Sequence, residues 1–130
     1  MIYEAFFLDC GLRASLEKDI LYKHITTEFK PSITHEHLYG EPAWFKIIGY
    51  ACDGNNEAYK VEMVHCDNDE LKALYEQIDI PHITISTSAT GKPVNSRYLE
   101  FKEIYPISKM LIETTFGGFD GKKIKTWKGE

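Results

Sequence analysis

Apolar and polar residues alternate along several short segments of the chain, and this pattern predicts β-strands. In residues 23–29, His24 and Thr26 share one face and Ile25 lies on the other, because successive side chains of a strand point to opposite faces. Further strands are expected at 2–9, 43–53, 57–66 and 81–87, with a hairpin turn at 53–56. We therefore expect a chain rich in strands, several of which have one apolar and one polar face.

A spacing of three to four residues between apolar positions predicts two helices. Leu12, Leu16 and Ile20 recur every four residues within residues 12–22, with charged residues between them. In residues 67–78, four apolar residues follow the i, i+3, i+4, i+7 pattern, behind a capping pattern that starts at Asp67. Loops are expected at 30–42 and 88–96, and two strands around a turn at Gly117–Gly118 near the end of the chain.

The two predicted strand-helix-strand segments are related by an internal repeat. A shift of 58 residues, the separation of His24 and His82, aligns residues 1–30 with residues 59–88 without a gap. The identical pairs are Glu4 and Glu62, Asp9 and Asp67, Leu16 and Leu74, Ile20 and Ile78, and the two His-Ile-Thr triplets. A two-fold-like packing of the units would bring their polar faces together. We expect a single α+β domain over residues 1–130.

Length, composition and charge limit the class of protein. A chain of 130 residues with 43% hydrophobic and 27% charged residues is typical of one soluble globular domain. No apolar run approaches the roughly 20 residues of a membrane span, and there is no signal pattern, so we expect a cytoplasmic protein without a membrane partner. The net charge of −5 argues against binding to long duplex nucleic acid, because that affinity depends on phosphate neutralisation.

The two histidines and two threonines of the repeat can carry acid-base chemistry. An imidazole with a pKa near 6.5 can act as base or acid close to neutral pH, so His24 and His82 facing one cleft suit a reaction that needs both. Thr26 and Thr84 lie two residues further on the same faces, where their hydroxyls can donate to a phosphate oxygen. We therefore predict in-line displacement at phosphorus with no metal and no cofactor. The alternative is that the isoleucines are core and both histidines are bystanders.

Two His-x-Thr motifs on duplicated strands resemble the 2H phosphoesterase superfamily. The branch that is most similar contains vertebrate 2′,3′-cyclic-nucleotide 3′-phosphodiesterase and the cyclic phosphodiesterase domain of fungal tRNA ligases. The similar stretches are "HITTEF", "YGEPAWFKI" and "PHITISTSATGKPV", within residues 20–105. These 130 residues are much fewer than those of the vertebrate enzyme and do not include its kinase-like half.

The resemblance implies a bilobal α+β fold in which antiparallel sheets flank a central cleft. It implies hydrolysis of 2′,3′-cyclic phosphates of nucleotides or RNA ends to 2′-phosphates, with His24 and His82 as acid and base and Thr26 and Thr84 as phosphate ligands. Pro93 and Val94 match the loop that lines the nucleotide end of the cleft. Alternatives are a phosphodiesterase for 2′,5′-oligoadenylate or cyclic-oligonucleotide signals, and a non-catalytic RNA- or nucleotide-binding module. We expect a monomer.

Other residue clusters are weaker candidates for a site. His35 and His37 have no companion ligand at a recognised spacing, so we expect a solvated loop rather than a metal site. Cys10, Cys52 and Cys66 form no C-x-x-C pair and are expected to be free thiols. Remaining candidates for contacts with RNA are aromatic or basic residues, for which core packing or an edge strand is the alternative: Tyr39, Phe45, Lys122, Lys123, Lys125, Trp127 and Lys128.

Overall fold

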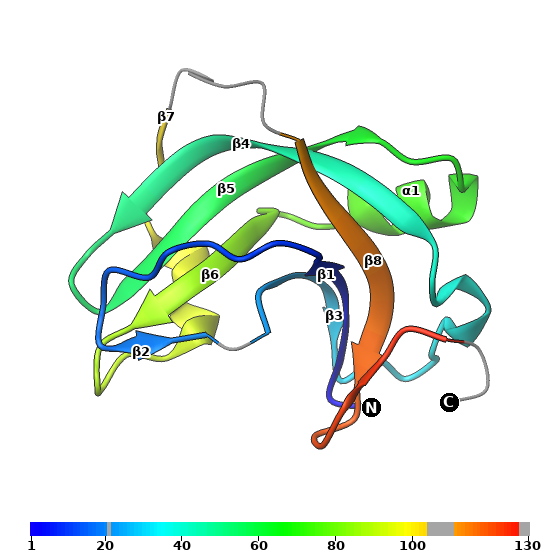
Figure 1. The fold of residues 1–130 in the computed structure, drawn as a ribbon, viewed down its shortest axis with the longest axis horizontal. Helices are drawn as coiled ribbons and strands as arrows, with labels where there is room; N and C mark the ends of the chain where they lie inside the picture. Colours follow the sequence, from blue (N-terminus) through cyan, green and yellow to red (C-terminus); the bar gives the residue numbers. More distant parts are fainter. Residues whose placement is uncertain (21, 104–110, 128–130) are drawn as a thin grey trace.

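The alternating segments form one curved antiparallel sheet, which is accompanied by one α-helix in the described part of the chain (Figure 1). The structure is a computed structural model that describes residues 1–20, 22–103 and 111–127. The predicted α+β class is confirmed. The elements in chain order are β1 (Tyr3–Leu8), β2 (Lys18–Asp19), β3 (His24–Phe29), η1 (Glu36–Leu38), β4 (Pro42–Cys52), β5 (Asn56–His65), α1 (Asp69–Glu76), β6 (His82–Thr87), η2 (Pro93–Tyr98), β7 (Lys102–Glu103), β8 (Leu111–Phe119) and β9 (Ile124–Lys125).

The order of strands in the sheet places the two His-x-Thr strands near opposite ends. The path is β2-β6-β5-β4-β8-β1-β3, with β7 paired to β4 and β9 to β8. Each described pairing is antiparallel. β3 and β6 nevertheless contact each other, because the sheet curves into an arch that Figure 1 shows from β6 over β5 and β4 to β8, β1 and β3. Curvature, rather than direct strand pairing, therefore brings the two motifs together.

One face of the sheet holds the hydrophobic core. Phe6, Ile25 and Phe116 from one end of the strand path and Ile83 and Ile85 from the other are fully buried in one cluster. Phe6 packs edge-on against Phe116, with ring centroids 5.5 Å apart. Because neighbouring residues of a strand face opposite sides, burial of Ile25 and Ile83 directs the residues on either side of each away from the core.

The helix predicted at residues 12–22 is wrong. In the described residues this segment has no helical turn; it crosses to the other end of the sheet, where β2 pairs with β6. Its backbone donors bond distant partners: Ser15 N–H donates to Glu57, Leu16 N–H to Ser86 and Ile20 N–H to the Ile85 carbonyl. An isolated helix of this length is marginally stable, so these tertiary bonds outweigh its apolar spacing.

The second predicted helix is confirmed as α1, with shorter bounds and a different cap. The side chain of Asn68, not Asp67, accepts a hydrogen bond from Leu71 N–H at 2.9 Å. Leu71 is fully buried and Leu74 and Tyr75 pack against the core, as the apolar spacing predicts. The repeat thus corresponds to strands in both units but to a helix only in the second.

The turn predicted at Gly117–Gly118 is also wrong. Both glycines lie inside β8, and the chain turns after it, at residues 120–123. A side chain at Gly117 would collide with the carbonyl of Lys125 in β9, and one at Gly118 with the Tyr39 hydroxyl. Close packing, rather than a turn, therefore explains these glycines. Within residues 1–20, 22–103 and 111–127, none of the helices is both long and apolar enough to cross a bilayer.

Candidate active site

His24 and His82 lie on two strands that contact each other, β3 and β6. Each histidine is partly exposed, whereas the isoleucine that follows it is fully buried. Burial lowers the pKa of His24, and the nearby His82 lowers it further, so the two imidazoles are within electrostatic reach of each other. The structure therefore brings together two histidines that are 58 residues apart in the sequence.

Both histidines use the same ring nitrogen to bind the backbone carbonyl two residues earlier in the chain. Nδ1 of His24 donates to the carbonyl oxygen of Tyr22 at 2.5 Å, and Nδ1 of His82 donates to that of Ile80 at 2.7 Å. Because a carbonyl oxygen only accepts, Nδ1 carries the hydrogen in both rings. Nε2 is therefore the nitrogen that can take up or release a proton in each motif.

Both imidazoles have pKa values below their ordinary value of 6.5, mainly because burial disfavours the charged form. The hydrogen bonds to Tyr22 and Ile80 oppose this lowering, while Arg97 lowers the pKa of His82 further. At neutral pH in the absence of an anion, both rings are therefore mostly neutral and able to act as bases. A bound phosphate would raise these pKa values and allow one ring to serve as the acid.

Aromatic side chains surround His24. Tyr3 stacks on its imidazole with ring centroids 4.4 Å apart and planes inclined by 18°. Phe7, the cross-strand partner of His24, lies 5.8 Å away. Burial, together with the Tyr22 hydroxyl, raises the pKa of Tyr3 to about 12, so Tyr3 stays neutral where histidine titrates. These rings restrict the orientation of the His24 imidazole and shield one of its sides from water.

Basic side chains lie near His82 instead. Lys60 is its cross-strand partner in β5, and Arg97 in η2 is close enough to lower its pKa, after the larger effect of burial. The two ends of the site therefore differ: the His24 end is aromatic and the His82 end is basic.

A buried hydrogen-bond network holds η2 beside Thr84. The Thr84 and Ser96 hydroxyls are 3.0 Å apart, and Ser96 is fully buried. Asn56 Nδ2 donates to Ser96 Oγ at 3.0 Å and to the Lys92 carbonyl oxygen at 2.6 Å. Ser96 Oγ accepts from both Asn56 Nδ2 and the Thr84 hydroxyl, so the network fixes the Thr84 side chain beside η2.

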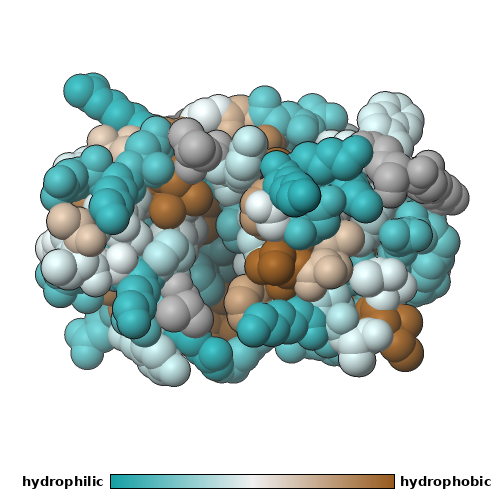
Figure 2. Space-filling view, turned by 90° about the horizontal axis from the view of Figure 1, so that it is seen from below, coloured by the Kyte–Doolittle hydropathy of each residue, from teal (hydrophilic) through white to brown (hydrophobic). Residues whose placement is uncertain are grey.

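The remaining residues predicted for the site have less defined roles. Thr26 is partly exposed on the same face as His24, as the strand alternation predicts. The carbonyl oxygen of Pro93 lies 3.5 Å from the Thr84 hydroxyl, so this loop does border the second motif. Val94 belongs to η2, but its side chain lies outside the described residues. Figure 2 shows a hollow between the two sides of the molecule, on the face turned downward in Figure 1.

His35 and His37 lie in a largely exposed segment, and each contacts a carboxylate. Glu4 is fully buried and accepts from His35 Nδ1 at 2.8 Å, from His35 N–H at 2.7 Å and from the Tyr39 hydroxyl at 2.8 Å. His37 pairs with Glu70 at 2.6 Å. Within the described residues, no group of three or more histidines, cysteines and carboxylates is placed to hold a metal.

The other candidates for RNA contact fall into two groups. Tyr39 and Phe45 are buried, which excludes them as stacking surfaces in this conformation. Trp127 is 72% exposed beside β9, and Lys125 pairs with Asp120 at 3.8 Å, so the charged edge strand expected as the alternative is present. Lys128 lies outside the described residues. Burial raises the pKa of the Cys66 thiol, which disfavours a reactive thiolate.

Sequence reasoning missed Tyr3, Ser96 and Arg97. Their places beside the motifs depend on strand pairing and on the path of η2, neither of which has a local sequence signal. Tyr3 had a partial signal in the sequence. If the N-terminal strand pairs with β3, every second residue of it lies on the same face of the sheet as His24.

Three comparisons with known proteins add no neighbour to this picture. No protein-family model matches the chain, and neither a curated protein nor a solved structure matches it.

Proposed function

We propose that this chain is a metal-independent phosphodiesterase of the 2H type, which hydrolyses 2′,3′-cyclic phosphates of nucleotides or RNA ends to 2′-phosphates. One observation carries the proposal: two His-x-Thr strands contact each other and hold their imidazoles in the same tautomer. In this proposal the curved sheet is the bilobal 2H fold, with β3 in one lobe and β6 in the other. The cleft between them is the substrate site.

The proposed reaction needs one neutral and one protonated imidazole. Nε2 of the neutral ring takes a proton from water, whose oxygen forms a bond to phosphorus. The bond from phosphorus to O3′ breaks, and Nε2 of the protonated ring gives its proton to O3′. The products are a 2′-phosphate and a free 3′-hydroxyl, and proton exchange with water restores both rings.

The threonines and the basic end of the site would stabilise the transition state. Negative charge builds on the non-bridging phosphate oxygens during the displacement, so aligned donors lower the barrier. The Thr26 hydroxyl can donate directly, and the Thr84 hydroxyl, which donates to Ser96 in the free protein, can turn its proton toward a bound phosphate oxygen. Arg97 adds a positive charge near His82. These residues would interact with the phosphate oxygens, whose negative charge grows in the transition state, rather than with the uncharged groups of the substrate.

Substitution of the histidines tests this proposal. Removal of either imidazole in His24→Ala or His82→Ala should lower kcat for a 2′,3′-cyclic nucleotide by about 10²–10⁴-fold, because each acts in proton transfer. Phosphorus NMR would follow the conversion of cyclic phosphate to 2′-phosphate, with and without EDTA. His37→Ala is the matched control, since His37 pairs with Glu70 on the surface.

Three results would contradict the proposal or redirect it. Turnover retained in the His24→Ala, His82→Ala double variant would exclude the mechanism, and loss of turnover in EDTA would exclude metal independence. Binding of a 2′-nucleotide without hydrolysis of any cyclic phosphate would instead indicate a binding module. The same assay with 2′,5′-linked oligoadenylate and cyclic oligonucleotides identifies the alternative substrates.

A further inference from the structure

The buried network around Thr84 begins at Asn56, a residue outside both motifs. Asn56 is the first residue of β5, and its backbone is fixed on two sides. Its N–H donates to the Asp53 carboxylate at 2.8 Å, and it pairs with Thr87 of β6. Only 2% of Asn56 is exposed. Asn56 is therefore a rigid, buried support next to the second motif.

The amide group of Asn56 uses both of its hydrogens on η2, which lies beside β5 and β6 (Figure 1). Nδ2 donates to the Lys92 carbonyl oxygen at 2.6 Å and to Ser96 Oγ at 3.0 Å. Because a carbonyl oxygen only accepts, the bond to Lys92 directs the NH₂ end of the amide toward η2. Asn56 thus holds η2 against β5 and sets the position of the Ser96 oxygen.

Ser96 connects Asn56 to the second motif. Ser96 is fully buried, and its Oγ accepts a hydrogen bond from the Thr84 hydroxyl at 3.0 Å. Such a network is rigid, because breaking one of its bonds leaves a buried polar group without a partner. The Thr84 side chain is therefore held in place before a ligand arrives, and only its proton has to turn to reach a phosphate oxygen.

The first motif has a different environment. The residue 58 positions before Ser96 is Leu38, a buried core residue without a hydroxyl. In residues 1–20, 22–103 and 111–127, the hydroxyl of this strand that bonds the backbone is that of Thr27, which donates to the Glu4 carbonyl oxygen at 3.1 Å. Thr26 itself is partly exposed. The two threonines of the motifs are therefore not equally supported.

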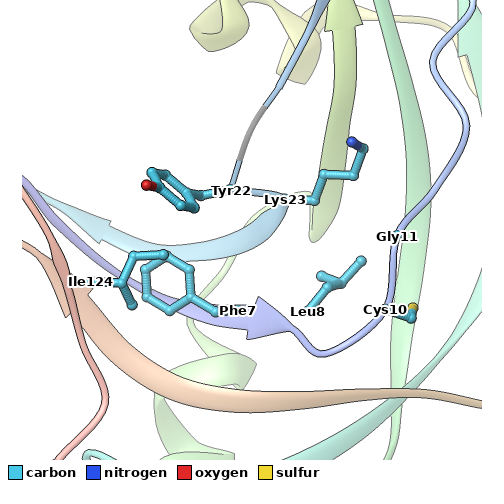
Figure 3. Close-up of a pocket in the computed structure, with 7 residues that line it drawn as sticks. All are labelled: Phe7, Leu8, Cys10, Gly11, Tyr22, Lys23 and Ile124. Atoms are coloured by element: carbon cyan, nitrogen blue, oxygen red, sulfur yellow. The ribbon is translucent and has the colours of Figure 1, made fainter.

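A pocket of about 130 Å³ lies near the first motif instead of a buried polar network (Figure 3). Its lining includes Lys23 but neither His24 nor Thr26. The Lys23 ammonium group bonds the Asp19 carboxylate at 2.6 Å and the Ile20 carbonyl oxygen at 3.0 Å, so its hydrogen bonds go to the segment before β3. This lining does not orient the hydroxyl of the first motif.

We propose that Asn56 and Ser96 are positioning residues of the active site, which hold the Thr84 hydroxyl where its proton can reach the phosphate, whereas Thr26 is oriented only by the ligand. The inference rests on the proposed function for the reaction in which this phosphate takes part. It adds that the two threonines contribute unequally, because the network has already removed the freedom that an unsupported side chain loses on binding. Since charge on the phosphate oxygens grows in the transition state, loss of this positioning should lower kcat more than it raises KM.

A double-mutant cycle tests whether Ser96 acts through Thr84. Ser96→Ala should lower kcat for a 2′,3′-cyclic nucleotide by about 2- to 10-fold, the effect of one hydrogen bond. In the Thr84→Val background, which keeps the shape but has no hydroxyl, Ser96→Ala should lower kcat no further. In the Thr26→Val background it should lower kcat by the same factor as in the wild type. A merely structural role would lower kcat equally in both backgrounds.

Two further variants test the start of the network and its specificity. Asn56→Ala should lower kcat at least as much as Ser96→Ala, because it releases both Ser96 and the Lys92 carbonyl. Unchanged kcat in folded Asn56→Ala would exclude Asn56 as a positioning residue. Ser88→Ala removes a hydroxyl that lies 3.2 Å from Asn55 Oδ1, and it should leave kcat unchanged. Urea unfolding shows which variants are folded, and the cycle with Ser96→Ala decides the case if Asn56→Ala is not.

The outcomes separate this inference from the phosphodiesterase proposal. Equal effects of Ser96→Ala in the wild type and in both threonine backgrounds would overturn the positioning role and leave the proposed hydrolysis intact. If the wild type hydrolyses no cyclic phosphate, the proposed function fails, and the same cycle is measured on the dissociation constant of inorganic phosphate by phosphorus NMR. Coupling of Ser96 to Thr84 alone would then support the positioning role. Additive effects, or no binding of phosphate by the wild type, would overturn it.

Discussion

His24 and His82 use the same nitrogen to bind the backbone, yet their neighbours differ. His24 stacks on Tyr3, whereas His82 lies near the guanidinium of Arg97. Aromatic rings hold an imidazole in place without adding charge, while a cation disfavours the protonated form and attracts an anion. Single residues therefore make the two motifs chemically unequal although their sequences are nearly the same.

Replacement of Arg97 separates its two effects. Arg97→Gln should raise the pKa of His82, because a nearby positive charge is removed, although burial still keeps that pKa low. The value of kcat/KM should fall by about 1.5- to 5-fold, the effect of an exposed ionic contact. Proton NMR titration of the histidine ring signals measures the pKa values. Lys72→Gln on α1 changes the net charge equally, and the same shift in that variant would contradict the assignment.

At the level of elements, the segment before β3 is the main departure from expectation. A helix between β1 and β3 would have made the two repeats alike, but the chain instead pairs β2 with β6. Glu57 is buried and accepts hydrogen bonds from Ser15 N–H, Ser86 and Tyr50. Those hydrogen bonds lower the pKa of Glu57 and together outweigh the opposing effect of burial, the largest single influence. The buried carboxylate thus fixes the crossing segment.

The Ser86 hydroxyl connects the crossing segment to Glu57, and a substitution by alanine removes it with little change in side-chain volume. Ser86→Ala leaves Leu16 N–H without its acceptor and removes a donor to Glu57, so the free energy of unfolding should fall by about 1–3 kcal/mol. Urea unfolding measures this change. Hydrogen exchange should become faster at Ser15 and Leu16. Thr90→Ala, at an exposed hydroxyl, is the control, and unchanged exchange in Ser86→Ala would contradict this account.

The elements that could be predicted from sequence are those with a local signal. Alternation predicted β3 and β6, β-prone residues bounded by turn signals predicted β1, β4 and β5, and apolar spacing predicted α1. Apolar spacing wrongly predicted a helix at residues 12–22. The hydrogen bonds that hold this segment extended go to Glu57 and Ser86, which are distant in the sequence. The prediction of a turn at Gly117–Gly118 was wrong for a similar reason, because the sequence does not show that β9 packs closely against these glycines.

For the whole molecule, the curvature of the sheet matters most. β3 is the last strand of the path and β6 the second, so a flat sheet would separate the motifs by the width of the intervening strands. The arch in Figure 1 removes this separation and leaves both histidines partly buried. Burial then lowers both pKa values, so the site makes stability depend on pH.

The two histidines should make the folded protein less stable in acid. The folded chain binds protons on these rings less readily than the unfolded chain, because their pKa values are below 6.5. The free energy of unfolding should therefore decrease as pH falls below 6.5 and be constant above it, as far as these groups contribute. Urea unfolding of the wild type and of the His24→Gln, His82→Gln variant at several pH values isolates their contribution. An equal pH dependence in both proteins would contradict it.

Strands β1, β3, β4, β5 and β6, the faces on which His24, Thr26, His82 and Thr84 lie, and helix α1 could be predicted from the sequence alone. These properties follow from residues a few positions apart. The pairing of β2 with β6, the places of Tyr3 and Arg97 beside different histidines, and the curvature through which β3 and β6 meet are visible only in the folded structure. These features depend on burial and hydrogen bonding between segments that are far apart in the chain, so a local pattern of apolar residues cannot predict them.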